Sequence, residues 1–255
     1  MTNFPDNGLP EDFREAMVKQ EQEKKVKQIL QETTRGVFRE LASRGPNACT
    51  PEHIGVAQKL VEAVREKDYP AILRILDKAT LPAGTSLEVR ECRETSFGDQ
   101  SDLFIPLPDG RRDMDIFATL RFEDSPMGAW QAFLLHQMWH YLPLWWHSNY
   151  ARRDYIYSKE DLKGTILGRS IEDSGVRRYM NLMGCRVASL NPDALALTPE
   201  IYFENGKYYI TCCFWSDFGG LKRAYALITL TDGRMEGFEI FDEKVLFAYD
   251  CGILF

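Results

Sequence analysis

The sequence predicts an α+β fold, in which an N-terminal helical region precedes a domain built mainly from antiparallel sheet. Helical periodicity dominates residues 12–78, two-residue alternation replaces it from Ser86 onward, and tight-turn sequences separate the C-terminal strands. Because helices and strands are segregated along the chain rather than alternating, a parallel doubly wound sheet is disfavoured. We expect a helical region over residues 1–82 and an α+β domain over residues 83–255, or one continuous domain containing both.

Three helices are expected in the N-terminal region. The first spans residues 12–44, which carry an apolar stripe near helical spacing, and Gly45-Pro46 ends it. The second begins at Thr50, a good N-cap residue, with Pro51 at the first helical position and His53 in the slot that completes the cap. A third, shorter helix covers residues 69–78.

The middle of the chain combines strands with one long aromatic-rich helix. Alternating residues predict strands at 86–93, 103–107, 114–122 and 150–158, and helical spacing returns around 171–183. Ser125-Pro126 starts a helix that Pro143 ends or kinks. Because apolar residues surround the axis of this helix between Met127 and Leu142, we expect it to be largely buried.

The C-terminal third is predicted to be an antiparallel meander. Its expected strands are residues 200–204, 207–215, 223–231, 234–241 and 245–249. Asn205-Gly206 and Asp232-Gly233 are hairpin turn sequences, because a type I′ turn needs positive φ at both central residues. Large apolar residues occupy both the even-numbered and the odd-numbered positions of 207–215, and therefore both faces of the strand. Neither sheet face is expected to be fully solvated. Cys212 and Cys213 should point to opposite faces.

Composition and charge narrow the expected class of protein. The chain of 255 residues has a net charge of −7, which repels phosphate backbones and disfavours nucleic-acid binding. No apolar run is long enough to cross a bilayer, so no membrane association is expected. The N-terminus lacks the pattern of a secretory signal, and the cysteines lack CxxC spacing. A cytoplasmic protein with reduced cysteines is therefore expected, and the sequence leaves its oligomeric state open.

The densest chemical signal lies between Trp130 and Tyr157, which contains four of the five tryptophans and three of the four histidines. We expect the ligand-binding residues to lie where this segment leaves the buried helix: Trp146, His147, Tyr150, Arg152 and Arg153. Arginine binds carboxylates bidentately, and exposed aromatics beside arginine have the composition of binding hot spots. The alternative is a strand with a charged outer face and cross-strand aromatic pairs, which is a common arrangement.

A metal centre is a second possible reading of this segment. His136 and His140 stand four residues apart, which places both rings on one face of a helix. The helical zinc motif needs a glutamate beside the first histidine, but Gln137 occupies that position and cannot act as a general base. A third ligand would have to come from elsewhere, such as Asp113 or Asp115. We therefore expect no bound metal and no other cofactor.

The function predicted from the sequence is that of a non-catalytic cytosolic binding protein that recognises a protein or a small ligand. An immunity-type inhibitor of a basic partner is one concrete form, because the chain is acidic. The alternative is a metal-dependent hydrolase that uses His136 and His140. No complete catalytic constellation, phosphate-binding loop or nucleophile elbow is present in the sequence, so we expect no catalytic residues.

Overall fold

A computed structural model describes residues 11–65, 68–81, 83, 88–95, 98–106, 112–113, 116–139, 154–172, 195–216 and 220–247. Contacts within the chain divide it into two compact units, Met1–Arg44 and Gly45–Phe255. The predicted division at residue 82 stays a prediction.

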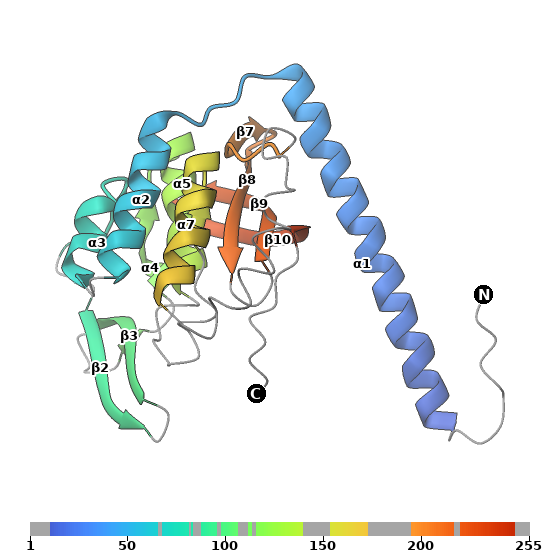
Figure 1. The fold of residues 1–255 in the computed structure, drawn as a ribbon, viewed down its shortest axis with the longest axis horizontal. Coiled ribbons are helices and arrows are strands. Elements are labelled where there is room, and N and C mark those ends of the chain that lie inside the picture. The colour runs from blue at the N-terminus through green and yellow to red at the C-terminus, as the bar shows by residue number, and fades with distance from the viewer. Residues whose placement is uncertain are drawn as a thin grey trace. The chain divides into compact units, whose positions relative to one another are not determined.

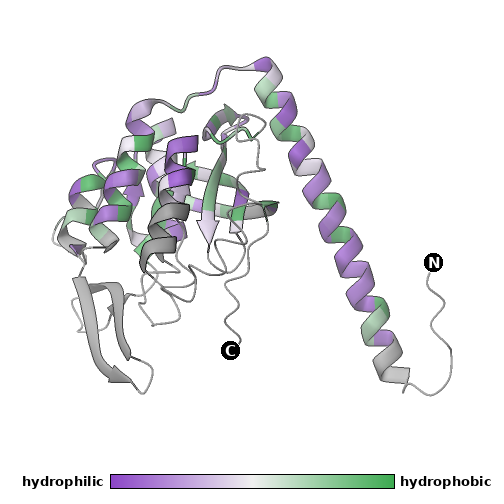
Figure 2. Ribbon diagram, in the orientation of Figure 1, coloured by the Kyte–Doolittle hydropathy of each residue, from purple (hydrophilic) through white to green (hydrophobic). Residues whose placement is uncertain are grey.

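The described part of the first unit is one long helix, α1 (Glu11–Arg44), in agreement with the predicted span (Figure 1). Hydrophilic residues dominate its ribbon (Figure 2), and the apolar side chains of Val18, Val26 and Ile29 are exposed.

Helices and antiparallel sheets together form the second unit, which confirms the α+β class. The helices are α2 (Pro51–Arg65), α3 (Tyr69–Ile75), α4 (Ile116–Thr119), α5 (Pro126–Trp139) and α7 (Lys159–Glu172). The strands are β1 (Ala79–Thr80), β2 (Glu88–Thr95), β3 (Gly98–Pro106), β4 (Arg112–Asp113), β5 (Arg121–Phe122), β6 (Asp154–Ile156), β7 (Glu200–Glu204), β8 (Lys207–Ser216), β9 (Gly220–Thr231) and β10 (Arg234–Phe247). None of the described helices is both long and apolar enough to span a bilayer.

The main sheet has five strands, of which four (β7 to β10) form the C-terminal meander and the fifth is β6. Its order is β10-β9-β8-β6, and β7 also pairs with β8. Both predicted hairpin turns are confirmed, because Asn205, Gly206, Asp232 and Gly233 all have positive φ. One boundary was wrong. The predicted strands 234–241 and 245–249 form the single strand β10, whose pairing with β9 continues through several register shifts. Bulges of this kind let a strand continue past an irregular residue.

Two other sequence predictions need correction. Residues 114–122 do not form one strand, because Ile116–Thr119 is a short helix and only Arg121–Phe122 is strand. Ile116 and Leu120 are both buried and stand four apart, so helical spacing outweighed the alternation. Helix α7 covers residues 159–172, where no separate helix was predicted, and Ser158 Oγ accepts a hydrogen bond from the Asp161 backbone N–H at its start. Of the helix expected at 171–183, only the first two residues are described, and both are helical. Residues 173–183 lie outside the described part.

Helix α5 packs at the centre of the unit, as its sequence predicts. Six of its apolar side chains are buried: Ala129, Trp130, Ala132, Phe133, Leu134 and Leu135. They belong to one apolar cluster with residues of α2, α3 and the sheet, including Leu60, Ile72 and Ile210. The side chains of Met138 and Trp139, and residues 140–142, lie outside what the structure describes.

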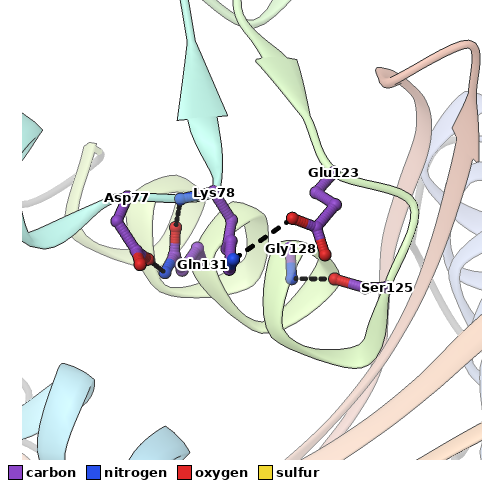
Figure 3. A network of polar contacts seen from close by, with 6 residues as sticks. All are labelled: Asp77, Lys78, Glu123, Ser125, Gly128 and Gln131. Carbon is purple, nitrogen blue, oxygen red and sulfur yellow. Dashed lines mark hydrogen bonds and ion pairs between the residues drawn. The ribbon is translucent and has the colours of Figure 1, made fainter.

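A buried polar network fixes the start of α5 against the chain that leads into β1 (Figure 3). Gln131 is fully buried, and its amide donates to Asp77 Oδ1 at 2.7 Å and accepts from the Lys78 backbone N–H at 2.9 Å. Lys78 also forms an ion pair with Glu123 at 3.2 Å. Because both ends of the Gln131 amide have partners, this buried polar group stabilises one specific docking of the helix.

The cap predicted at the start of α2 is confirmed. The backbone N–H of Thr50 donates to His53 Nδ1 at 3.1 Å, and Thr50 Oγ1 lies 2.8 Å from the same nitrogen. An imidazole nitrogen that accepts a backbone hydrogen bond carries no proton, so the proton of the neutral ring resides on Nε2. The capping interaction therefore requires neutral His53, which is buried.

Acidification is expected to destabilise the protein through His53. Burial lowers the pKa of His53, against the opposing influence of Glu52 and the Pro126 backbone. Its stabilising effect is complete above the unfolded pKa of about 6.5, because there both states are neutral. As pH falls below that value the unfolded chain takes up the proton first, so stability decreases until the folded pKa is passed.

Denaturant unfolding of wild type and His53→Gln at several pH values measures this effect. Glutamine can accept the Thr50 hydrogen bond but does not titrate. The variant should lose less stability than wild type between pH 7 and pH 5. Equal losses in the two proteins would assign the acid sensitivity to other groups.

Apolar residues occupy both faces of the main sheet, as expected from the alternation in β8. Tyr208, Ile210, Cys212 and Phe214 face the large cluster around α5. Cys213 and Trp215 face a second, smaller cluster, whose other members are Ile156, Leu162, Leu197 and Leu221. The prediction that Cys212 and Cys213 point to opposite faces is therefore confirmed.

The free side of β7 is bound by the segment that precedes α2. Asn47 Oδ1 accepts hydrogen bonds from the backbone N–H groups of Cys49 and Ile201, each at 2.9 Å, and its Nδ2 donates to Pro199 O at 3.0 Å. Ala48 N–H donates to Ile201 O at 2.9 Å. Both backbone groups of Ile201 are thus satisfied on this side.

Candidate functional site

The residues predicted to bind a ligand, Trp146, His147, Tyr150, Arg152 and Arg153, all lie outside the described residues. The structure therefore does not show whether these residues lie close together, and their role stays a prediction.

Of the two histidines considered as an alternative metal pair, the structure describes only His136. His136 belongs to α5, and its ring stacks on Phe238 with centroids 3.5 Å apart and contacts Phe117 at 5.3 Å. His140 lies outside the described part, as does Asp115. Within the described ranges no group of three metal-ligating side chains occurs. The aromatic contacts of His136 favour a packing role, and the absence of metal stays a prediction.

A surface groove between α2 and α3 is one candidate for ligand binding. It has a volume of about 360 Å³ and is lined by Glu52, Gly55, Val56, Lys59, Ala71, Arg74, Ile75 and Asp77. Arg74 pairs with Asp68, and Asp77 accepts the hydrogen bond of Gln131. Because two of the four ionic groups of the groove already have partners in the protein, the groove is a weaker candidate than the sheet face described next.

The strongest candidate site lies on the side of the main sheet that faces away from α5. Glu200 on β7 stands directly opposite Thr211 on β8, and Cys213 on β8 stands opposite Arg223 on β9. Thr211 and Cys213 are two residues apart in one strand and therefore share a face. The strand pairing thus gathers a carboxylate, a hydroxyl, a thiol and a guanidinium on one side of the sheet.

Arg223 is a partly buried cation with incomplete hydrogen bonding. Its Nη2 donates to the backbone oxygen of Ala196, to which the Cys213 thiol also donates at 3.8 Å. Its Nε is buried and has no hydrogen-bond partner. No carboxylate among the described residues forms an ion pair with Arg223. A partly buried charge that no ion pair compensates is destabilising, so an anionic group at this position would stabilise the protein.

Thr211, on the strand next to that of Arg223, also has a buried polar atom without a hydrogen-bond partner. Its side chain is completely buried, and its Oγ1 has no hydrogen-bond partner in the structure. Buried polar atoms in folded proteins are nearly always satisfied by protein or ordered water. Two unsatisfied atoms on neighbouring strands of one face therefore make this face a candidate position for a bound ligand or an ordered water.

Cys213 is not activated as a nucleophile in this site. Burial raises the pKa of its thiol, and the nearby guanidinium of Arg223 opposes that effect without reversing it. For Arg223, burial acts to lower the pKa, but the thiol, Tyr225 and Glu200 raise it overall, so the guanidinium stays charged. A protonated thiol is a poor nucleophile.

Sequence reasoning predicted the strand that carries Thr211 and Cys213 but did not identify this site. The missing information was tertiary, because Glu200 and Arg223 reach the same face only through the registers of two hairpins. Counting outward from the Asn205-Gly206 turn pairs Glu200 with Thr211, a signal that could have been used. The sequence between β8 and β9 contains no two-residue hairpin turn from which the residue opposite Arg223 could be counted.

Comparison with known proteins adds no functional assignment. No protein family model, no curated protein and no solved structure matches the chain. Any functional inference therefore depends on the residues and their arrangement.

Proposed function

We propose that this protein is a non-catalytic binding protein that holds a small polar ligand on the sheet face carrying Glu200, Thr211 and Arg223. The supporting observation is the pair of buried, unpartnered polar atoms, Arg223 Nε and Thr211 Oγ1. Atoms of this kind destabilise the unliganded protein. A ligand that supplies the missing partners would recover that free energy on binding, which is how a preformed polar site gains affinity and specificity.

A stability measurement separates a binding role of Arg223 from a structural one. Arg223→Met keeps the aliphatic stem and removes the charge, while the Cys213 thiol still donates to Ala196 O. We expect the variant to be as stable as wild type without ligand, or more stable, because replacing buried charges by apolar groups is often neutral or stabilising. A lower midpoint in denaturant would indicate a structural role.

A ligand screen tests the proposed function directly. Thermal unfolding of wild type and Arg223→Met would be followed with organic acids, amino acids and nucleotides, each at millimolar concentration. At least one class should raise the midpoint of wild type and not of the variant, because a ligand that binds only the folded state stabilises it. Recovery of that compound unchanged by mass spectrometry would support the absence of catalysis. If no class acts, or if each acts equally on both proteins, the proposal is wrong.

A basic protein partner is the second candidate, and the net charge of −7 favours it. Association with such a partner, as in an immunity-type inhibitor, would depend on long-range attraction and weaken steeply as salt is added. Binding of a small ligand at the partly buried Arg223 would be screened much less. Salt dependence of any interaction that is found therefore distinguishes the two candidates.

A further inference from the structure

We propose that the ligand of this face is a zwitterion, an α-amino acid with an apolar side chain, whose ammonium group pairs with Glu200 and whose carboxylate pairs with Arg223. The inference rests on the binding function proposed above and adds the chemical class of the ligand. It is carried by two opposite charges on one sheet face that do not pair with each other.

The placement of the two charges follows from strand register. Glu200 is opposite Thr211, and Thr211 is opposite Tyr225 on the next strand. Arg223 lies two residues from Tyr225 and therefore on the same face. Neighbouring strands are about 4.8 Å apart, so the strands of Glu200 and Arg223 are separated by about 10 Å, with the strand of Thr211 between them.

The side chains are close enough to interact electrostatically but are not joined. Glu200 contributes to raising the pKa of both Arg223 and Cys213. Neither Glu200 nor Arg223 takes part in an ion pair with another described residue. The buried hydroxyl of Thr211, which also lacks a partner, belongs to the intervening strand. A molecule that carries both charges, and whose ammonium or carboxylate group also hydrogen-bonds to the Thr211 hydroxyl, matches this arrangement.

Ligands with one charge match it less well. A simple anion beside Arg223 would be repelled by the Glu200 carboxylate, and a simple cation beside Glu200 would be repelled by the guanidinium. A zwitterion satisfies both groups and adds no net charge to a partly buried face. The carboxylate can also accept from Arg223 Nε, the donor that the protein itself leaves without a partner.

The apolar side chain is inferred from the neighbours of Arg223. Leu221 lies two residues from Arg223 on β9, and Trp215 lies opposite Leu221 on β8. Both belong, with Leu197, to the smaller apolar cluster on this face. These three side chains are almost completely buried, and the partly exposed members of the cluster are Leu195, Leu246 and Phe247. A branched aliphatic side chain of an amino acid anchored at Arg223 would pack against this partly exposed edge and gain from burial.

Isothermal titration calorimetry of the full chain with three probes tests the proposal. L-leucine carries both charges, 3-methylbutylamine lacks the carboxylate, and 4-methylpentanoate lacks the ammonium group. L-leucine should bind at least about tenfold more tightly than either analogue, the order expected for loss of a charge-assisted hydrogen bond.

Variants assign each charge to its residue. Glu200→Gln should weaken the binding of L-leucine and leave the binding of 4-methylpentanoate unchanged or stronger, because it removes a repulsion. Arg223→Met should abolish the binding of both. Thr211→Val, which replaces the hydroxyl with a methyl group, should weaken L-leucine binding several-fold. Glu204→Gln, on the same face of β7 but further from Arg223, is the matched control and should bind L-leucine like wild type.

The outcomes separate this inference from the proposed function. If 4-methylpentanoate binds as well as L-leucine, or if Glu200→Gln has no effect, the ligand is not a zwitterion, although a binding protein for anions would stand. If none of the three probes binds but the ligand screen finds another compound that depends on Arg223, only the present inference fails. If neither experiment finds a ligand, ordered water satisfies these atoms and both proposals are wrong.

Discussion

Replacing Gly128 with alanine is expected to destabilise the protein by about 3 kcal/mol, at the upper end of the effects of overpacking. Gly128 lies in the first turn of α5, where its N–H donates to the Ser125 hydroxyl at 3.1 Å (Figure 3). A Cβ atom at this position would stand 1.9 Å from the backbone oxygen of Glu123. No side-chain rotation can relieve that contact, because both the added carbon and the oxygen are fixed by the backbone.

The chain around Glu123 has little freedom to move away. Its N–H donates to Lys78 O at 2.9 Å, and its carbonyl accepts from the Ser125 N–H at 2.8 Å. Chemical denaturation of Gly128→Ala measures the loss, and Gly164→Ala is the matched control. Gly164 is also helical, but its added Cβ would meet nothing within 4 Å. The control should gain up to about 1 kcal/mol from helix propensity. Similar behaviour of the two variants would contradict the contact.

Truncation of Trp130 to alanine is expected to cost about 3 to 5 kcal/mol, as for other large core residues. The side chain is fully buried and stacks on Phe133 with ring centroids 5.4 Å apart. Its Nε1 donates to His53 O at 2.8 Å, which links α5 to the first turn of α2. Loss of the indole removes packing on α5 and leaves a buried carbonyl oxygen without that donor.

A second substitution divides these two contributions. Trp130→Phe keeps a six-membered aromatic ring but loses the hydrogen bond and the packing of the five-membered ring, so it should cost less than Trp130→Ala, about 1 to 3 kcal/mol. Urea unfolding of both variants against wild type gives the comparison. Equal losses would mean that the five-membered ring, with its hydrogen bond to His53, dominates. A loss below about 1 kcal/mol for alanine would contradict central packing of α5.

The sequence predicts the elements whose signals are local. The cap formed by Thr50 and His53 and the turns at Asn205-Gly206 and Asp232-Gly233 depend on neighbouring residues, and the structure contains them. The burial of α5 was also predictable, because its apolar residues surround the axis and leave no polar face.

Elements that depend on tertiary contacts were less predictable. Residues 116–122 alternate weakly and fold as a helical turn followed by a short strand, because Phe122 pairs with Ala79 and its N–H donates to Gly233 O at 2.7 Å. The site at Glu200, Thr211 and Arg223 was missed for the same reason. Each residue is ordinary within its own strand, and only the register of three strands brings them together.

The hydrogen bonds of Asn47 have a consequence for how the protein behaves at high concentration. A sheet edge with free backbone groups is a template on which another chain can add a strand, and such addition leads to aggregation. At Ile201 in β7 no other chain can form these hydrogen bonds, because Asn47 and Ala48 already bind both backbone groups of Ile201 and the carbonyl of Pro199. A single amide side chain thus imitates a neighbouring strand and closes that stretch of edge to intermolecular pairing, without extending the sheet.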